Sequence, residues 1–145
     1  MKSLNVKEIW NISSVDYVKA IIKNIEVRLM KEGMKLPVRV ETLMSSDYKP
    51  ELDATAELEP YGITMCRELM GKLRWEIEIV RLDILHEVSV ISSCQSSPCD
   101  GHLQKILHIF ALLKMNPKLT LYFDPNIAII DPTSFIGSTA KEICN

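Results

Sequence analysis

Two cysteines and two histidines have the residue types of a metal site. Cys94, Cys99, His102 and His108 are spaced Cys-x4-Cys-x2-His-x5-His, and zinc prefers four thiolate or imidazole ligands arranged as a tetrahedron. The spacing fits poorly, because a C2H2 finger places about a dozen residues between its cysteine pair and its histidine pair. His102 and His108 also share one expected helix at positions that point in different directions. We interpret the four residues as incidental and expect no bound metal.

Nucleophilic and phosphate-binding patterns are equally weak. The candidate nucleophiles Cys66, Cys94, Cys99 and Cys144 stand in no Cys/His/Asn order typical of a protease. There is no Gly-x-Ser-x-Gly elbow, and the five glycines are scattered singly, without a Walker loop or a Gly-x-Gly-x-x-Gly. Two-metal phosphoryl chemistry needs carboxylates clustered at strand ends. Four acidic residues lie instead in an expected loop, where they are solvated: Asp47, Asp53, Glu57 and Glu59. The sequence predicts no catalytic residue and no cofactor.

A charged pair and one histidine are interpreted as structural. In Arg81-Leu82-Asp83-Ile84, which joins two expected helices, Asp83 is placed to cap the following helix. Arg81 is placed to pair with a carboxylate or with carbonyls at the end of the preceding helix. His102 falls in the first turn of another helix, where packing or capping fits better than metal ligation.

Apolar residues at three- and four-residue steps predict helices over residues 14–31, 64–80, 82–94 and 101–115. Ser13 is expected to cap the first helix and Gly33 to end it. Gly71 lies inside the second helix, where glycine costs about 1 kcal/mol relative to alanine, so we expect it to pack closely against a neighbour. A strand over residues 119–123 has no evident partner strand, which indicates an incomplete unit.

The predicted fold is therefore mainly α, with about four helices and a short C-terminal strand. The predicted core consists of Val18, Ile22, Ile25, Leu69, Leu73, Trp75, Ile84, Val88, Leu103, Ile106 and Phe110. Residues 1–145 are expected to form a single, partial domain. Within it, residues 34–62 are an irregular acidic connection interrupted by prolines, and residues 126–145 are a weakly structured tail.

Composition narrows the functional classes. Hydrophobic residues make up 47% and charged residues 25%, which is typical of a globular chain. No run of about 20 apolar residues predicts a membrane-spanning helix, and the first residues lack the apolar stretch of a signal peptide. Four cysteines are too few and too irregular for a disulfide scaffold, so we expect a cytoplasmic or nuclear protein that is not secreted. The net charge of −2 lacks the basic excess of a domain that binds nucleic acid alone.

Several short segments together resemble one family. They are Trp10 with Ser13-Ser14 and Tyr17-Val18-Lys19; Tyr48-Lys49-Pro50-Glu51-Leu52-Asp53; Arg67-Glu68-Leu69-Met70-Gly71-Lys72-Leu73-Arg74-Trp75; Arg81-Leu82-Asp83-Ile84; Gly101-His102-Leu103; His108-Ile109-Phe110-Ala111-Leu112-Leu113-Lys114; and Tyr122-Phe123-Asp124-Pro125. In order and spacing, over about residues 10–135, they resemble the polyprotein of copia-type LTR retrotransposons. That family has a Leu-x-Gly-x-Leu-x-Trp helix, an Arg-x-Asp-Ile turn, a Gly-His-Leu helix start and a Phe-Asp-Pro strand end.

The resemblance implies the thumb and connection region of a reverse transcriptase, upstream of RNase H. It carries over no catalytic residue, because the palm's Tyr-x-Asp-Asp and the RNase H acidic cluster are absent from the sequence. The implied partners are an RNA/DNA primer-template in the full polyprotein, and the palm or RNase H regions; no membrane is implied. Basic residues on the matching helices are the expected nucleic-acid contacts: Arg67, Lys72, Arg74, Lys105 and Lys114. The structural motif residues are Gly71, Trp75, Arg81, Asp83 and His102.

Three positions depart from the family pattern. Val80 stands where glycine is frequent, Cys99 where a basic residue is common, and Leu112 where tyrosine is frequent. The missing base beside the fourth helix puts phosphate contact there in question, and the changes suit a decaying or repurposed copy. Two other functions stay open: a repurposed protein–protein interaction module without nucleic-acid function, using exposed apolar surface, and an independent small enzyme or zinc protein.

Overall fold

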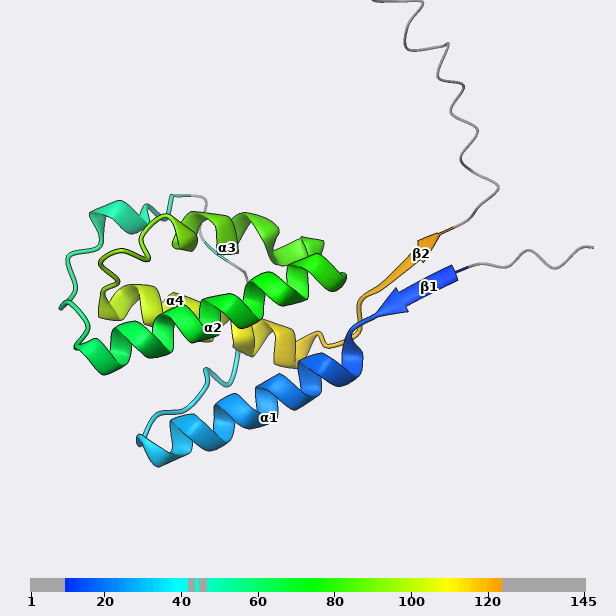
Figure 1. Cartoon of the computed structure of the whole chain (residues 1–145), viewed down its shortest axis with the longest axis horizontal. Helices are drawn as coiled ribbons and strands as arrows, with labels where there is room; N and C mark the ends of the chain where they lie inside the picture. The colour runs from blue at the N-terminus through cyan, green and yellow to red at the C-terminus, as the bar shows by residue number, and fades with distance from the viewer. Residues whose placement is uncertain (1–9, 42–43, 45–46, 124–145) are drawn as a thin grey trace, which may run out of the picture. The chain divides into compact units, whose positions relative to one another are not determined.

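Four α-helices pack around a shared apolar core in the computed structural model, which describes residues 10–41, 44 and 47–123 (Figure 1). The helices are α1 (Val15–Lys31), α2 (Pro60–Ile79), α3 (Leu85–Ser92) and α4 (Asp100–Met115), with 3-10 turns η1 (Pro50–Leu52) and η2 (Leu82–Ile84). They belong to one unit, Ile12–Thr120. The mainly α fold is confirmed. Within the described residues, no helix has the length and apolar character needed to cross a membrane.

The helix α4 holds the core together, because it contacts α1, α2 and α3. Its buried residues are His102, Leu103, Ile106, Leu107, Ile109, Phe110, Ala111 and Leu113. Every predicted core residue is buried except Trp75, whose side chain is 52% exposed. That prediction was wrong because Trp75 follows the buried Leu73 by two positions, which places it about 200° around the helix from the apolar stripe.

Helix ends differ from the prediction where local geometry overrides composition. Pro60 begins α2 rather than interrupting a helix, since the first helical N–H needs no partner. Ser14, not Ser13, precedes α1, and its side chain forms no capping hydrogen bond. The third predicted helix divides into η2 and α3. Gly33 follows α1 with a φ of +73°, as expected for a residue that ends a helix.

The C-terminal strand does have a partner in the chain. Strand β2 (Thr120–Phe123) pairs with β1 (Trp10–Ser13) in an antiparallel two-stranded sheet. The expectation of an unpaired strand was wrong, because a four-residue strand is too short to show a periodic pattern. The predicted tail over residues 126–145, which includes Cys144, lies outside the described residues.

The second half of the acidic connection is fixed to the start of α4. The Asp100 N–H donates to Ala56 O at 2.9 Å and the Gly101 N–H to Thr55 Oγ1 at 2.8 Å. The Thr55 side chain, with its backbone N–H, holds the pKa of Asp53 below its ordinary value. A β-carbon at Gly101 would collide with the Asp53 carboxylate, so any larger residue here would have to displace the Asp53 side chain.

His102 completes this attachment from inside the core. Its Nδ1 accepts a hydrogen bond from the Cys99 N–H at 3.0 Å, so the ring proton is assigned to Nε2, which donates to Pro50 O at 2.8 Å. The first bond satisfies a backbone donor that the start of a helix leaves free. The predicted capping role of His102 is confirmed.

Arg81 joins the turn after α2 to the end of α4. Its side chain is 1% exposed, and its Nε and Nη2 donate to the two Asp83 oxygens at 3.0 and 2.8 Å. Its Nη1 donates to the Asn116 carbonyl at 2.5 Å. The predicted carboxylate partner of Arg81 is therefore confirmed. The predicted cap by Asp83 was wrong, because Ile84 precedes α3 and no side chain caps that helix.

Glu76 is buried beside this charge cluster. Its carboxyl oxygens, and the nearby Ser14 hydroxyl, have no hydrogen-bond partner of good geometry among the described residues. Burial raises the pKa of Glu76, and this effect is partly offset by the Ser14 hydroxyl and by the charge of Arg81. The folded chain therefore holds a carboxyl group where ionisation opposes folding.

Replacing Arg81 tests how much its contacts with Asp83 and Asn116 stabilise the fold. Arg81→Ala should lower the free energy of unfolding by about 3 kcal/mol, because it empties the space of a fully buried side chain and removes the hydrogen bonds to Asp83 and to the Asn116 carbonyl. The matched control is Arg39→Ala, which removes an exposed ion pair with Glu41 and should cost under about 0.5 kcal/mol. Urea denaturation measures both, and equal effects would contradict the role assigned to Arg81.

Replacing Glu76 tests whether ionisation of its buried carboxyl group opposes folding. Stability contributed by the protonated carboxyl is lost as pH rises from the ordinary pKa of glutamate through the raised pKa of Glu76. Glu76→Gln should therefore exceed the native chain in unfolding free energy by about 1 kcal/mol near pH 8, and by less near pH 5. Glu78→Gln, at an exposed position of the same helix, should show no such pH-dependent gain. A constant difference across pH for Glu76→Gln would refute the prediction.

Candidate nucleic-acid interface

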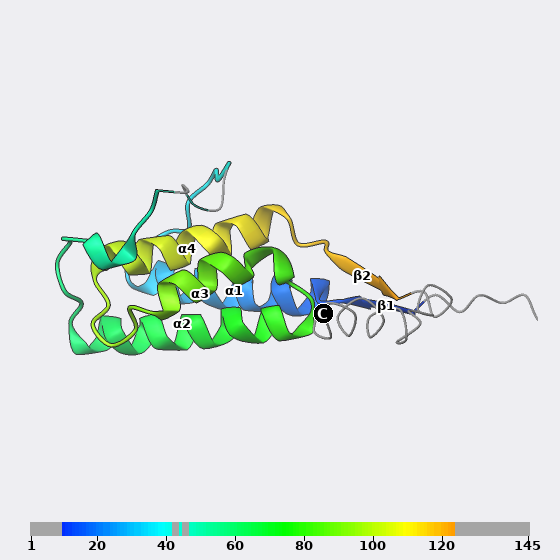
Figure 2. The same ribbon diagram turned by 90° about the horizontal axis from the view of Figure 1, so that it is seen from above.

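One side of α2 faces solvent along its length. We call it the α2 outer face. Its residues are Arg67, Glu68, Gly71, Arg74, Trp75 and Glu78, all exposed. Steps of three and four residues bring them to one side of the helix, while Met65, Leu69 and Leu73 are buried on the other side. Figure 2 shows α2 at an edge of the helical unit, so other helices cover its inner side alone.

Gly71 leaves the centre of this face open. A β-carbon built at Gly71 meets no atom within 4 Å, so the predicted close packing against a neighbour was wrong. Glycine in a helix interior costs about 1 kcal/mol relative to alanine, and packing inside the unit does not explain it. The backbone of α2 is accessible here to any molecule that approaches the face.

Two arginines and one indole surround this opening. Arg67 and Trp75 lie four residues to either side of Gly71, and Arg74 lies three residues after it. Neither arginine forms an ion pair with a described residue. The face therefore offers two uncompensated guanidinium groups and a large aromatic surface.

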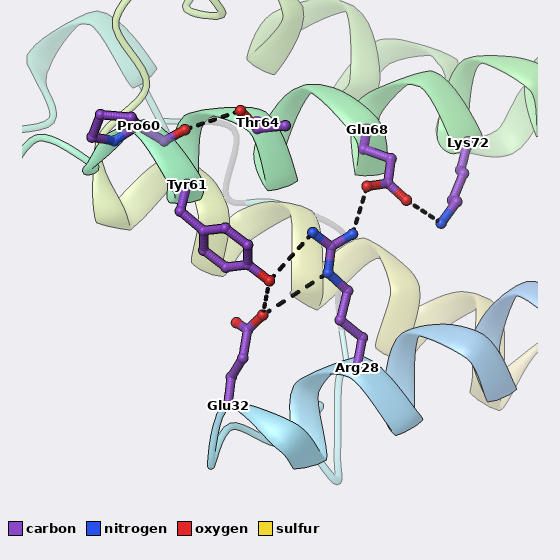
Figure 3. Close-up of polar contacts among 7 residues, drawn as sticks. All are labelled: Arg28, Glu32, Pro60, Tyr61, Thr64, Glu68 and Lys72. Atoms are coloured by element: carbon purple, nitrogen blue, oxygen red, sulfur yellow. Dashed lines mark hydrogen bonds and ion pairs between the residues drawn. The ribbon is translucent and has the colours of Figure 1, made fainter.

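Lys72 is held at the margin of the face by its neighbours. Its Nζ donates to Glu68 Oε1 at 2.9 Å, and Arg28 of α1 donates to Glu68 Oε2 at 2.5 Å (Figure 3). These two bonds hold the pKa of Glu68 below its ordinary value. The Tyr61 hydroxyl donates to Glu32 and lies against Arg28 in the same network. The charge of Lys72 is thus compensated inside the network that joins α1 to α2.

The two predicted contact residues on α4 lie elsewhere. The Lys105 Nζ sits 4.9 Å from the centre of the Tyr48 ring, and Lys114 forms an ion pair with Glu26 of α1. The five basic residues expected to contact nucleic acid are therefore not gathered on one surface. Arg67 and Arg74 share the α2 outer face, Lys72 borders it, and Lys105 and Lys114 contact other segments.

The structure describes the candidate metal ligands and three of the four candidate nucleophiles, Cys66, Cys94 and Cys99. No group of three or more His, Cys, Asp or Glu lies placed to hold a metal ion among the described residues. Burial raises the pKa of the Cys66 thiol, and burial with the Asp53 and Glu57 carboxylates raises that of Cys99. Both shifts disfavour the reactive thiolate.

Sequence reasoning placed Trp75 in the core and Gly71 in a tight contact, and so missed the role of both in an exposed face. The signal was present: Gly71 and Trp75 are four residues apart, which puts them on the same side, away from the apolar stripe. Comparison of the chain with protein-family models, with curated proteins and with solved structures finds no match.

The open position of Gly71 predicts a gain in stability on substitution. Gly71→Ala should raise the free energy of unfolding by up to about 1 kcal/mol, since alanine favours the helix. Gly33→Ala is the contrasting control. Its φ of +73° is strained for alanine, so this change should destabilise the chain by about 1 kcal/mol. Thermal melting compares the two, and a loss of stability in Gly71→Ala would show that the site is not open.

Proposed function

We propose that the chain is a non-catalytic segment related to the thumb and connection of a copia-type reverse transcriptase, and that it holds primer-template duplex through the α2 outer face. The observation that carries the proposal is the group of Arg67, Arg74 and Trp75 around the open backbone at Gly71. Gly71 and Trp75 are also the residues through which α2 resembles the family's Leu-x-Gly-x-Leu-x-Trp helix. The proposal is thus supported by exposure and by sequence pattern.

Three features of the face suit a nucleic-acid duplex, whereas the carboxylates of Glu68 and Glu78 on the same face repel phosphate. Arginine pairs with phosphate through a planar fork of donors. An exposed indole offers a flat surface against sugar or base. The missing side chain at Gly71 lets a backbone strand approach α2 between the two arginines. None of these contacts reads base edges, so binding is expected to depend on duplex shape and charge rather than on sequence.

The charge balance predicts weak binding by the isolated chain. Two arginine contacts correspond to a salt slope of about −2, and the net charge of −2 opposes association with a polyanion. Affinity would then come from the whole polyprotein, in which the palm and RNase H regions add contacts. The role of this segment is to position duplex, and pure protein with Mg²⁺ and a primed RNA template should show no primer extension.

Arg81 and His102 lie outside α2 and affect the α2 outer face indirectly, through the position of α2 in the fold. Arg81 connects the turn after α2 to the end of α4, and His102 anchors the acidic connection that precedes α2. Both therefore constrain how α2 lies on α4. They are positioning residues, and no nucleic-acid contact is assigned to them.

Fluorescence anisotropy with an RNA–DNA duplex tests the proposal. The double variant Arg67→Ala, Arg74→Ala should weaken binding by about tenfold near physiological salt and bring the salt slope close to zero. The matched control Lys19→Ala, Lys23→Ala removes two exposed, like charges on α1 and should leave both nearly unchanged.

Gly71→Leu tests whether duplex approaches the backbone of α2 closely, without changing the charge of the α2 outer face. It adds a bulky side chain at an open site, so it should keep or raise the melting temperature and yet weaken duplex binding. Unchanged duplex binding in Gly71→Leu and in the double arginine variant would count decisively against the proposal.

A protein-binding module is the alternative, and one feature favours it. A groove of about 450 Å³ runs between α2 and α3, lined by Arg74, Ile77, Glu78, Leu85, Val88, Ser89 and Ser92. The nearby Leu82 and Leu85 are exposed. If Leu85→Asp abolishes capture of a stoichiometric protein partner while the arginine variants bind duplex normally, the alternative holds.

A further inference from the structure

Two adjoining hollows form a groove where α1 packs against α4 (Figure 1). We call it the α1–α4 groove. The wall of the first hollow, of about 250 Å³, includes Val18, Ile22 and Pro117, with Lys19 and Lys23. The wall of the second, of about 340 Å³, includes Leu29, Met30, Met34, Leu36 and Val38, with Lys35. Glu26 and Lys114 line both hollows, so their ion pair lies where the two meet.

The floor of this groove is aliphatic, and its apolar surface continues out to solvent. Ile22 and Leu29 are buried, whereas Met30 is 75% exposed and Val38 is 97% exposed. An apolar surface that continues from a hollow into solvent marks a contact site rather than a core. Methionine side chains adapt their shape to what they meet, so Met30 and Met34 suit a partner that enters from outside.

Lysines stand at the margins of the groove. Lys19 and Lys23 border the first hollow and Lys35 borders the second. None of the three forms an ion pair with a described residue. With Lys114 and Glu26, the lining residues include four lysines and one glutamate, an excess of three positive charges. The chain as a whole has a net charge of −2, so the groove is a local basic site and favours an acidic partner.

We infer that the α1–α4 groove binds an acidic, amphipathic helix of a partner protein. Ile22 in the first hollow and Leu29 in the second are seven residues apart on α1, about 10 Å along the helix axis. A helix that lies along α1 repeats its own positions at the same interval, so apolar side chains at i and i+7 reach one hollow each. Carboxylates beside these two anchors then meet Lys19, Lys23 and Lys35.

The charge at the middle of the groove is already balanced. Lys114 is paired with Glu26 between the two hollows, so the partner needs no carboxylate there. The lysines without an ion pair lie beside the hollows instead. The acidic residues of the partner therefore belong next to its two apolar anchors, where each anchor and its flanking charge are recognised together.

Neither nucleic acid nor a small ligand matches this lining as well. None of the described residues that line the two hollows is aromatic, so a base has no ring to stack on. A phosphate backbone has no aliphatic group to place on the floor. Pockets that enclose small ligands measure about 300–1,000 Å³. Hollows of about 250 and 340 Å³ lie near that lower limit and suit single anchor side chains.

The α1–α4 groove shares no residue with the α2 outer face or with the groove between α2 and α3. Binding of an acidic helix on α1 therefore does not depend on the duplex proposed for α2. If both ligands bind, they bind at the same time, and the chain connects a nucleic-acid duplex to a partner protein. Salt weakens both, because both rely on exposed charges.

Fluorescence anisotropy with labelled synthetic helices tests the groove. The acidic peptide carries leucine at i, i+4, i+7 and i+11, with glutamate beside the leucines. One comparison peptide replaces every glutamate by lysine, and the other keeps the composition but scrambles the leucine positions. The acidic peptide should bind the native chain at least about tenfold more tightly than either comparison peptide. Equal affinity for the three peptides would overturn the inference.

Substitutions at exposed apolar residues locate the peptide on the chain. Met30→Asp and Val38→Asp place a negative charge at the edge of the groove, so each should weaken binding of the acidic peptide by at least about tenfold. Val27→Asp is the matched control, because Val27 is 50% exposed on the same helix as Met30 but lies outside the groove. Melting temperatures show whether each variant folds. Folded Met30→Asp and Val38→Asp chains that bind the peptide as Val27→Asp does would contradict the assignment.

Charge reversal tests the lysines. Lys19→Glu with Lys23→Glu should weaken binding of the acidic peptide by at least about tenfold and strengthen binding of the lysine peptide, because the sign of the rim charge is then exchanged. Lys31→Glu with Lys49→Glu makes the same change in net charge at exposed positions outside the groove, and both affinities should stay within about twofold of native. The same response in both double variants would count against the groove.

The RNA–DNA duplex distinguishes the α1–α4 groove from the α2 outer face. Loss of duplex binding in the charge-reversal variant, but not in its control, would make the groove a nucleic-acid surface and overturn the inference. Duplex binding that depends on Arg67 and Arg74, in a chain that binds no acidic peptide, overturns it too and leaves the proposed function standing. A chain that binds the acidic peptide through the groove but binds no duplex does the reverse.

Discussion

The buried guanidinium of Arg81 is the interaction on which the arrangement of the helices most depends. It lies where α2 ends, pairs with Asp83 in the next turn, and donates to the carbonyl of Asn116 after α4. Because α4 contacts each of the other helices, a contact that fixes its end also constrains them. An apolar side chain would fill the same space, but it would satisfy neither the carboxylate nor the carbonyl.

Two residues of the α2 outer face, in contrast to Arg81, contribute little to the stability of the fold. Gly71 and Trp75 contribute little to the packing of their own helical unit, since one has no side chain and the other is half exposed. Glycine weakens the helix, and an exposed indole gains little from burial. Residues that oppose folding without serving the core are those expected at a contact surface, and we propose nucleic-acid duplex as the occupant of this one.

Charge pairing decides which basic residues are available for contact. Lys72, Lys105 and Lys114 resemble Arg67 and Arg74 in sequence, because all five are basic residues on amphipathic helices. In the fold, Glu68, Tyr48 and Glu26 lie against the three lysines. Those partners are distant in sequence for Lys105 and Lys114, so periodicity could not identify them. The acidic connection, in turn, is held by backbone hydrogen bonds to α4 that no residue pattern reveals.

The sequence alone determined the four helices, most of the core, the carboxylate partner of Arg81 and the capping role of His102, because these follow from local periodicity and from neighbours a few residues apart. The exposure of Trp75 was also present in the sequence, in its spacing from Leu73. Only the tertiary structure decided that β2 pairs with β1, that no neighbour packs against Gly71 and that Glu76 is buried without a well-oriented hydrogen bond to the described residues. Each of these depends on which side of an element meets another element far away in the chain, and a single helical pattern leaves that side undetermined at its margins.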